Sequence, residues 1–578
     1  QGKRKHFPGS SDPGFPSRSS VGTIVPGGSR RSDKQTHFAS CLNTSYSQCS
    51  PIRYGTTSCW KLSAAAVATL SLTPAITHNH SDRMEPMSLD QHDQLLIERT
   101  QPGNWSAPSG NQSFDLVVVG AGPAGLVAAV IAAGLGAKTA LIERHRLGGD
   151  CLHTGCVPSK ALLASARQAY QTQPGGQESP AVDFPQIMAR MRELRARLGE
   201  HDAAQRFQQL GIDVFFGQAR FNDPRTVHVE NDALTFRRCI LATGSRPVAP
   251  SIPGLKNVSY LTHETLFSLA ELPRRLAIIG AGPIGVEMAQ AFHRFGSQVT
   301  LIDQAKRLLP REDQEASQLL LDQFQQEGIQ VHLDTQVLEA ASQGNVQQLQ
   351  LQTPLRTELV EADQLLVATG RQANVESLDL EAAGISYQAE RIQVDDHLRT
   401  TNRRIFAAGD VIGDQQFTHA ADAMARLCIR NAFFFGRRSW PTYPVPHATY
   451  TDPEIAQIGL TAAEADRQGL AIDTYRVPFS GIDRCVLDGN EKGFIAAHCR
   501  QGTGQLLGAT IAGHRAGELI NTFSLLMSRR LSLGTLSNAI HCYPTQSQSL
   551  QQLGDQFQRS RLSPWSARLL KRVIGWRR

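Results

Sequence analysis

The stretch FDLVVVGAGPAG, Phe114–Gly125, decides the fold of this chain. Its apolar run predicts a buried strand that leads directly into a Gly-x-Gly-x-x-Gly turn made by Gly120, Gly122 and Gly125. The first glycine permits the tight turn, the second lets the backbone approach a pyrophosphate, and the third lets the next helix pack closely. The stretch therefore predicts the start of a dinucleotide-binding unit, with the phosphates held at a helix N-terminus.

The residues after the turn continue the same unit. LVAAVIAAGLGA, residues 126–137, is rich in small apolar residues and predicts the helix. KTALIER, residues 138–144, predicts the second strand, and its acid, Glu143, is placed to accept hydrogen bonds from ribose hydroxyls. Because strand, glycines, helix, strand and acid occur in this order, a chance match to the glycine motif is disfavoured.

A second copy of the unit follows at residues 274–303, RRLAIIGAGPIGVEMAQAFHRFGSQVTLID. It carries Gly280, Gly282 and Gly285 and ends at Asp303, and in both copies the acid lies eighteen residues after the third glycine. Two dinucleotide sites in one chain imply electron transfer between two dinucleotides, most simply a nicotinamide and a flavin. The alternative is a degenerate second unit that binds nothing.

The acid of the second copy bears on which nicotinamide binds. Asp303 would accept a hydrogen bond from a ribose 2′-hydroxyl and repel a 2′-phosphate, so it favours NADH over NADPH. Lys306 and Arg307 lie close enough in sequence to weaken that preference.

Three further stretches read as apolar strands that end in small residues: ILATGSRP (240–247), LLVATGRQAN (365–374) and RIFAAGDV (404–411). Small residues suit a backbone that passes close to a bound cofactor. The cofactor-contact candidates in these stretches are Thr243, Gly244, Gly370, Gly409 and Asp410. The last of them would bind a flavin ribityl hydroxyl or, equally, cap the next helix.

The stretch GGDCLHTGCVPSK, residues 148–160, places Cys151 and Cys156 near a predicted helix start, with four residues between them. A helix N-terminus lowers a thiol pKa, so thiolates would be present at neutral pH. A zinc site needs four ligands, and His153 is the only other close candidate. A static disulfide would close only a very short loop. The pattern therefore favours a pair that cycles between thiol and disulfide.

Together with GGDCLHTGCVPSKAL, the two ATG strands and the AAGD strand, TDPEIAQIGLT (451–461) makes the chain resemble the class I pyridine nucleotide–disulfide oxidoreductases. That family includes glutathione reductase, dihydrolipoamide dehydrogenase and mercuric reductase, and the resemblance covers roughly residues 114–564. IDRCVLDGNEKGF (482–494) and IHCYPTQSQ (540–548) look most like the mercuric-reductase-like members. The resemblance implies an α/β fold with two Rossmann-like domains and a C-terminal α+β dimerisation domain. It also implies FAD in the first site, NAD(P)H in the second, and a homodimer.

The resemblance also implies residue roles and domain bounds. Cys156 corresponds to the sulfur against the flavin and Cys151 to the thiol that meets the substrate, while Lys160 and Glu287 match a family pair near the flavin. The expected domains are FAD-binding at 113–247 and 371–438, NAD(P)-binding at 248–370, and dimerisation at 439–562.

The C-terminal segment HCYPTQSQ, residues 541–548, departs from the disulfide-reducing members of the family. Those members have a His-Pro-Thr motif followed by a glutamate, and the histidine serves the partner subunit as acid and base. Here Tyr543 and Gln548 stand at those positions, and tyrosine is a poor base near pH 7. His541 either substitutes or is an ordinary interface histidine.

These departures bear on the electron acceptor. They disfavour a lipoamide or glutathione reductase and leave a mercuric-reductase-like enzyme with a small-molecule or metal–thiolate acceptor. No cysteine follows Cys542, so the C-terminal cysteine pair of mercuric reductases is missing.

Composition sets wider bounds on the 578-residue chain, of which 41% is hydrophobic and 19% charged. These values are typical of a globular enzyme with several domains. The net charge is +6, but the residues before Met84 carry +7, so the body shows no nucleic-acid footprint. Residues 1–112 predict a disordered leader and a cytoplasmic protein, or a transit peptide and an organelle. No apolar run is long enough to span a membrane.

The tail, residues 563–578, predicts a basic amphipathic helix. From Arg559 onward there are seven Lys or Arg and no acid, interleaved with Trp565, Leu569, Leu570, Val573, Ile574 and Trp576. Such a helix would lie on an anionic membrane surface or dock on its own dimer. The first alternative would suit a membrane-peripheral flavin redox sensor.

Overall fold

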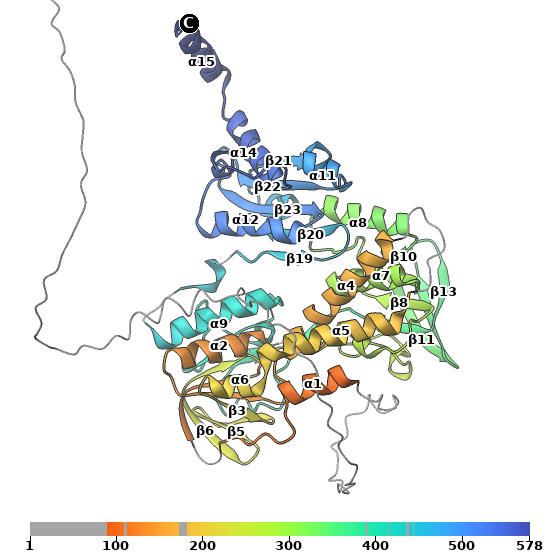
Figure 1. Ribbon diagram of the computed structural model, residues 1–578, viewed down its shortest axis with the longest axis vertical. Coiled ribbons are helices and arrows are strands. Elements are labelled where there is room, and N and C mark those ends of the chain that lie inside the picture. The colour runs from red at the N-terminus through yellow and green to blue at the C-terminus, as the bar shows by residue number, and fades with distance from the viewer. Residues whose placement is uncertain are drawn as a thin grey trace, which may run out of the picture. The chain divides into compact units, whose positions relative to one another are not determined.

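The computed structural model describes residues 90–108, 112–172, 182–388, 391–413, 415–434, 438–442 and 444–577. All of them belong to one compact unit of the chain, Pro86–Arg578 (Figure 1). The fold is mixed α/β, as the sequence predicts. Its main sheets are a mixed sheet with a parallel core, an all-parallel sheet, and an antiparallel sheet in the C-terminal part.

The first sheet contains the glycine turn of the opening stretch. Its strands run β3-β2-β1-β6-β5-β4, and β18 also pairs with β6. The bounds are β1 Gln112–Val119, β2 Thr139–Glu143, β3 Ile212–Phe216, β4 Ala219–Asp223, β5 Thr226–Val229, β6 Asp232–Leu241 and β18 Ile405–Ala407. Strands β3, β2, β1, β6 and β18 are mutually parallel, so their carboxyl ends meet at one edge. Val119 is in register with both Ile142 and Leu241 at that edge.

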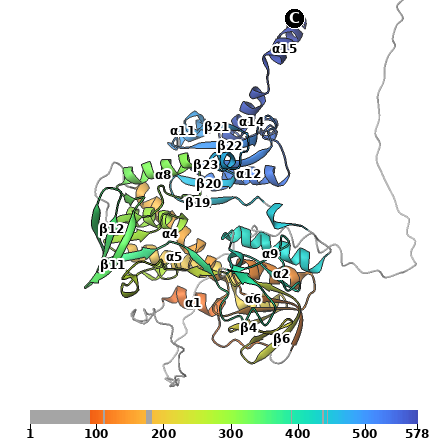
Figure 2. The same ribbon diagram turned by 180° about the vertical axis from the view of Figure 1, so that it is seen from behind.

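Helices cover this sheet and connect it to the second one. They are α2 Pro123–Gly134, α3 Gly149–His153, α4 Cys156–Gln171, α5 Phe184–Leu198, α6 Ala204–Gln209 and α9 Thr418–Phe433. Helices α2 and α9 pack side by side, as Figures 1 and 2 both show. Helices α4 and α5 pack on each other, and α4 also packs on α7 (Pro283–Phe295) of the second unit.

The second sheet repeats the design with strand order β10-β9-β8-β14, all parallel. Its elements are β8 Arg275–Ile279, β9 Gln298–Ile302, α8 Gln314–Glu327, β10 Gln330–His332 and β14 Gln364–Val367. A three-stranded antiparallel sheet accompanies it, made of β11 Gln336–Gln343, β12 Val346–Gln352 and β13 Thr357–Ala362. The chain leaves and re-enters the first unit through two paired strands, β7 Ser245–Pro247 and β15 Arg371–Ala373. Strands β16 Tyr387–Gln388 and β17 Arg391–Ile392 form a small antiparallel pair.

The C-terminal part is an antiparallel five-stranded sheet of order β19-β20-β23-β22-β21. Its strands are β19 His447–Thr449, β20 Glu454–Gly459, β21 Ile472–Pro478, β22 Phe494–Arg500 and β23 Leu506–Gly513. Its helices are α10 Ala462–Arg467, α11 Asp483–Leu487, α12 Ala516–Ser528, α13 Thr535–Asn538 and α14 Gln548–Ser560. This is the α+β unit expected at the C-terminus.

Helix α1, Gln91–Thr100, falls within the segment 1–112 that the sequence predicts to be a leader. Leu96 is 2% exposed and packs with Leu152 and Ala196. Asp93 forms an ion pair with Arg195 at 2.5 Å. The part of this segment that forms α1 is therefore packed on the folded body, because Leu96 and Asp93 have partners on α3 and α5. Residues 1–89 lie outside the described part of the chain.

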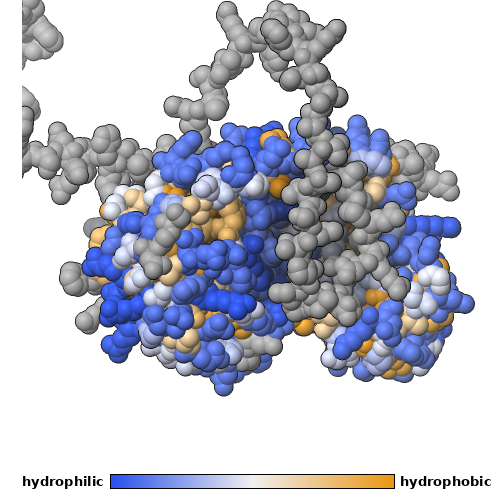
Figure 3. Space-filling model, turned by 90° about the horizontal axis from the view of Figure 1, so that it is seen from below, coloured by the Kyte–Doolittle hydropathy of each residue, from blue (hydrophilic) through white to orange (hydrophobic). Residues whose placement is uncertain are grey.

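The remaining features of the fold are its surface and the helix near the C-terminus. In Figure 3, hydrophilic side chains predominate on the face seen from below, with scattered hydrophobic patches among them. Helix α15, Pro564–Trp576, forms where the basic tail predicts one. Within the described residues, no helix combines the length and apolar character needed to cross a bilayer.

Candidate active site

The loop that leads into the cysteine pair packs on the first glycine turn. Cys151 is in α3 and Cys156 is the first residue of α4. The Gly148 N–H donates to the carbonyl of Ala121 at 2.9 Å. A Cβ added to Gly149 would lie 2.7 Å from the Cα of Gly122, so only glycine allows this approach. These two glycines therefore fix the start of the cysteine loop on the predicted pyrophosphate turn.

The two thiols are electrostatically unequal. They hydrogen-bond to each other, and Cys156 Sγ also lies 3.4 Å from Thr418 Oγ1 at the start of α9. The hydrogen bond from Cys151, helped by Thr418 and the charge of Lys160, lowers the pKa of Cys156. The same hydrogen bond, together with burial, raises the pKa of Cys151. These surroundings therefore favour a thiolate on Cys156 over one on Cys151.

His153, between the two cysteines, contacts the backbone of its own loop through one ring nitrogen. Its Nε2 hydrogen donates to the carbonyl of Leu147 at 2.8 Å. Burial lowers the pKa of His153 to about 4, so the ring is neutral at physiological pH. Its other ring nitrogen, Nδ1, is buried without a hydrogen-bond partner among the described residues.

Lys160 and Glu287 form an ion pair between the two dinucleotide-binding units. The Lys160 Nζ lies 3.0 and 2.8 Å from the two Glu287 oxygens, and Glu287 also accepts from the Tyr450 N–H at 2.9 Å. Burial alone would lower the pKa of Lys160, but the Glu287 carboxylate outweighs it and raises that pKa. Lys160 therefore stays cationic and supports the Cys156 thiolate.

The first glycine turn has the geometry of a phosphate cradle. Gly120 has φ +99°, and a Cβ there would lie 2.3 Å from the Ala242 carbonyl. A Cβ on Gly125 would lie 1.8 Å from the Gly120 carbonyl, so both positions are glycine because the fold requires it. At Gly122, by contrast, a Cβ would meet nothing closer than 3.9 Å, which leaves open space above the turn.

Glu143 closes this cradle. Its two carboxylate oxygens accept from the N–H groups of Ala121 (2.7 Å) and His145 (2.8 Å). Burial raises the pKa of Glu143 against the opposing effect of these bonds. Gly120, Glu143 and Thr243 line a cavity at the carboxyl edge of the first sheet. The open glycine turn and the acid beside it fit the pyrophosphate and ribose of FAD.

The second turn repeats the geometry of the first. A Cβ on Gly280 would lie 2.5 Å from the Ala368 carbonyl, and one on Gly285 would lie 1.8 Å from the Gly280 carbonyl. Nothing lies within 4 Å of a Cβ on Gly282. Asp303 accepts from the Ala281 N–H at 2.5 Å, as Glu143 does from Ala121. Open space at an intact turn fits the pyrophosphate of a nicotinamide dinucleotide and argues against a degenerate unit.

The strand ends that carry Thr243 and Gly244 are hydrogen-bonded to Asn374. Thr243 Oγ1 donates to the Asn374 carbonyl at 2.7 Å, and the Asn374 N–H donates to the Gly244 carbonyl at 2.9 Å. Gly409 has φ +80°, and an added Cβ would contact Ala421 on α9. Nothing within 4 Å would meet a Cβ on Gly370, so its surroundings are open.

Asp410 does not cap a helix, which corrects one of the two alternatives for it. The described helix after it, α9, begins beyond Phe417 without a side-chain cap. Instead, Asp410 accepts from Ser245 Oγ at 2.7 Å and lies 3.6 Å from the Arg371 guanidinium. Burial raises the pKa of Asp410 against these partners.

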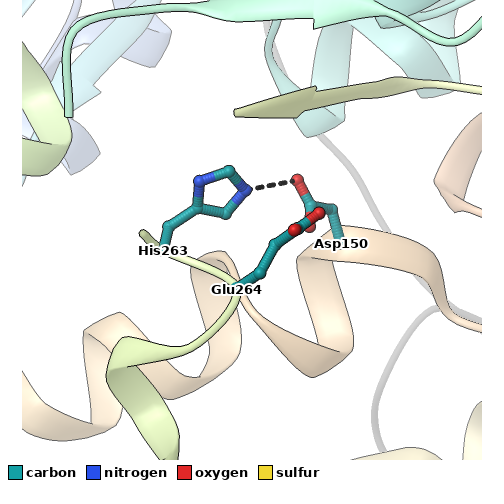
Figure 4. A group of neighbouring side chains, drawn as sticks. All are labelled: Asp150, His263 and Glu264. Carbon is teal, nitrogen blue, oxygen red and sulfur yellow. Dashed lines mark hydrogen bonds and ion pairs between the residues drawn. The ribbon is translucent and has the colours of Figure 1, made fainter. Parts of the chain in front are cut away.

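A charged network that the sequence does not predict lies beside the cysteines. Asp150, which precedes Cys151, accepts from Arg371 and lies 3.2 Å from Nε2 of His263 (Figure 4). Its other oxygen accepts from Thr154 at 2.5 Å. Burial would raise the pKa of Asp150, but the hydrogen bond with His263 and the charge of Arg371 hold it well below its usual range. The network therefore braces the loop between the two cysteines.

The same network contains a possible cation-binding geometry, since ligand atoms of Asp150, His263 and Glu264 lie within 4.8 Å of one another. However, Arg371 donates to Asp150, and its guanidinium also lies 2.7 Å from Nε2 of His263. A guanidinium on the same two ligand atoms excludes a cation there by repulsion. The cluster is an ion-pair network. Its only sequence signals were the Asp before Cys151 and the Arg after Gly370.

Tyr543 and His541 contact their own C-terminal part and not the cysteine pair. The Tyr543 hydroxyl donates to Asp483 at 2.9 Å, and that acid raises the pKa of Tyr543. His541 Nε2 donates to the Leu536 carbonyl at 3.0 Å. The Gln548 Oε1 is buried without a partner. Within one chain, the structure therefore does not bring the predicted acid–base residues to the dithiol.

Comparisons with known proteins agree with this geometry. Residues 114–425 match the family described as pyridine nucleotide-disulphide oxidoreductase, and residues 445–553 match the dimerisation domain of that family. The mercuric reductase of Bacillus cereus is 33% identical over 447 residues, which cover 76% of this chain and 71% of that protein. The dihydrolipoyl dehydrogenase of Bacillus subtilis is 34% identical over 462 residues, covering 76% of this chain and 96% of that protein.

Solved structures show the same relationship. The HOCl-induced flavoprotein disulfide reductase RclA of Escherichia coli is 30% identical, with a TM-score of 0.68, and the match covers 76% of this chain and 99% of RclA. RclA has also been solved as a Cu(II) complex. LpdA of Mycobacterium tuberculosis is 25% identical with a TM-score of 0.70, over 78% of this chain and 99% of LpdA.

The chain belongs to the class I pyridine nucleotide–disulfide oxidoreductases. It is an FAD- and NAD(P)H-dependent flavoprotein oxidoreductase that carries the family's dimerisation domain.

Proposed function

We propose that Cys151 and Cys156 form the redox-active pair of this enzyme and pass electrons from NAD(P)H to a small-molecule or metal–thiolate acceptor. When bound, FAD supplies the two-electron relay between a nicotinamide and a disulfide. The observation that carries the proposal is the unequal pair held on the first glycine turn. Reducing a disulfide by one hydride equivalent breaks the S–S bond and yields one thiolate and one thiol, which is the state that these surroundings favour.

Other residues of the chain would bind FAD and support the reactivity of the cysteine pair. The first turn, Glu143, Thr243 and Asp410 would hold FAD, while Lys160 would keep positive charge beside the Cys156 thiolate. Cys151 would be the sulfur that exchanges with the acceptor, as the family resemblance implies.

The second turn would hold the nicotinamide dinucleotide. The carboxylate of Asp303 stands at the ribose end of that turn, bound by the N–H groups of Ala281 and Ala305. Its negative charge supports NADH over NADPH, because a 2′-phosphate would be repelled. A free Arg307 near this site would weaken the preference for NADH. In the structure, however, its guanidinium donates to the Pro310 carbonyl at 2.7 Å.

The acceptor is proposed to be of the mercuric-reductase type rather than a free disulfide such as lipoamide. Two thiolates suit a soft metal, and both a mercuric reductase relative and the Cu(II) complex of RclA point in the same direction. Tyr543, with a raised pKa, is a poor general base for disulfide turnover. The proposed assembly is a homodimer built on the dimerisation domain.

Anaerobic reduction of the purified holoenzyme with NADH and NADPH tests the proposal. The wild-type protein is expected to take up about four electrons per bound flavin, and Cys156→Ser or Cys151→Ser about two. An acceptor screen with a mercuric–thiol adduct, lipoamide and glutathione disulfide follows. Uptake of only two electrons by the wild type would show that the pair is redox-inert. Faster turnover of lipoamide than of the mercuric adduct would overturn the acceptor assignment.

A further inference from the structure

Helix α15, Pro564–Trp576, is an ordered element that the catalytic site does not use. Ser563 caps its start by accepting from the Ser566 N–H at 3.1 Å. Its large apolar side chains are exposed, namely Trp565, Leu569, Leu570, Val573, Ile574 and Trp576. The two tryptophans at its ends are 72% and 92% exposed. A helix with this much apolar surface in water needs a partner surface.

The apolar and basic side chains occupy opposite arcs of the helix. At the α-helical repeat, Trp565, Leu569, Val573 and Trp576 form one stripe, and Leu570 and Ile574 widen it. Arg568, Lys571 and Arg572 fall together on the other side. This separation is typical of helices that lie in the interface between water and lipid.

The rest of the described chain leaves this face free. The match to the dimerisation domain ends at residue 553, before α15 begins. Neither Figure 1 nor Figure 2 places another described helix or strand against α15. A thirteen-residue helix is marginal in water by itself, so a surface that buries the apolar arc would stabilise it.

Charge decides which partner suits the helix. From Arg559 to the end there are seven Lys or Arg and no acid. Docking two copies of the helix against each other would bring like charges together, whereas a nucleic acid would leave the apolar arc in water. An anionic bilayer satisfies both arcs, since the tryptophans favour the headgroup level and the basic side chains pair with lipid phosphates. We propose that α15 lies parallel to the surface of a membrane containing anionic phospholipids and attaches the enzyme there.

Co-sedimentation of the full-length holoenzyme with lipid vesicles tests this proposal. Vesicles of phosphatidylcholine mixed with phosphatidylglycerol are expected to bind the enzyme, and vesicles of phosphatidylcholine alone to bind it much less. Trp565→Ala combined with Trp576→Ala should weaken binding about tenfold or more, as should Arg568→Gln combined with Lys571→Gln and Arg572→Gln. High salt should reverse the contribution of the basic side chains.

Matched controls keep the test specific. Leu355→Ala changes a leucine that is 94% exposed in the turn after β12, and Lys256→Gln changes an exposed lysine of the NAD(P)-binding unit. Both should leave vesicle binding unchanged, and a chain ending at Ser563 should keep its NADH-driven activity and lose binding. Absence of binding by the wild type would overturn the proposal. Tryptophan variants that dissociate the dimer without changing vesicle binding would assign α15 to a second copy of the chain instead.

Discussion

Several features of its surroundings together favour a thiolate on the Cys156 side chain. It begins α4, it shares a hydrogen bond with Cys151, and it lies near Thr418 and the Lys160 cation. Lys160 in turn keeps its charge because Glu287, only 4% exposed, pairs with it. Reactivity at this residue is thus a product of neighbours from three separate parts of the chain.

Alkylation of the reduced protein at different pH values tests this arrangement. Because the pKa of Cys156 is lowered, its reaction with iodoacetamide should reach half its maximum rate below about pH 8.5, the ordinary thiol midpoint. Lys160→Met removes the stabilising cation, so the midpoint should move upward by about one unit. Peptide mass spectrometry separates Cys156 from the exposed Cys542. Lys256→Met is the matched control, and an ordinary midpoint in the wild type would contradict the assignment.

At the scale of elements, the two glycine turns share one geometry. Within each turn, the middle glycine has a different role from the first and third glycines. The first and third glycines of each turn are required by the fold, because a Cβ there would meet a backbone carbonyl. The middle glycine has no such neighbour among the residues that the structure describes, apart from the 3.9 Å contact at the first turn. The need for glycine at this middle position is explained by a bound ligand rather than by packing within the protein.

Substitution of two glycines in the second turn separates these roles. Gly282→Ala should leave the free energy of unfolding nearly unchanged and raise KM for NADH about tenfold, since the methyl group would occupy the pyrophosphate space. Gly285→Ala should destabilise the protein by about 2 kcal/mol, because its Cβ would lie 1.8 Å from the Gly280 carbonyl. Thermal unfolding and steady-state kinetics measure the two effects. An unchanged KM in Gly282→Ala would argue against binding at this turn.

Helix α1 offers a second test at this scale. Leu96 is buried between Leu152 and Ala196, so Leu96→Ala should lower the free energy of unfolding by about 2–4 kcal/mol. The half-exposed Leu95 on the same helix is the control, and Leu95→Ala should cost well under 1 kcal/mol. Denaturant unfolding measures both changes. Equal effects would mean that α1 is not part of the folded body.

For the whole molecule, the C-terminal part exposes apolar side chains that a dimer would cover. Ile540 is fully exposed, and Leu525 and Tyr543 are more than half exposed. They lie within the match to the dimerisation domain. Large exposed apolar side chains on such a domain mark a protein–protein contact.

Ile540→Glu should convert the dimer to a monomer, because a carboxylate would be buried without a partner at the contact. Light scattering during size-exclusion chromatography measures the change. Leu355→Glu, at an equally exposed leucine of the NAD(P)-binding unit, should leave the oligomeric state unaltered. A dimer that persists in Ile540→Glu would place the contact elsewhere on this domain.

The sequence by itself determined the two nucleotide-binding units, the position of the cysteine pair and the apolar strands that end in small residues. Each of these depends on spacing along a short segment, where chain geometry allows few alternatives. The Lys160–Glu287 pair came only from family resemblance, because its members lie 127 residues apart.

The tertiary structure alone decided the contacts between distant segments. Arg371 reaches Asp150 across 221 residues and His263 across 108, and no local pattern announces such a network. The sequence around α1 resembles a leader, whereas the burial of Leu96 depends on contacts with α3 and α5. Side chains meet through packing of whole units, so their partners, and with them the pKa values of Asp150 and Cys156, follow from the fold rather than from spacing.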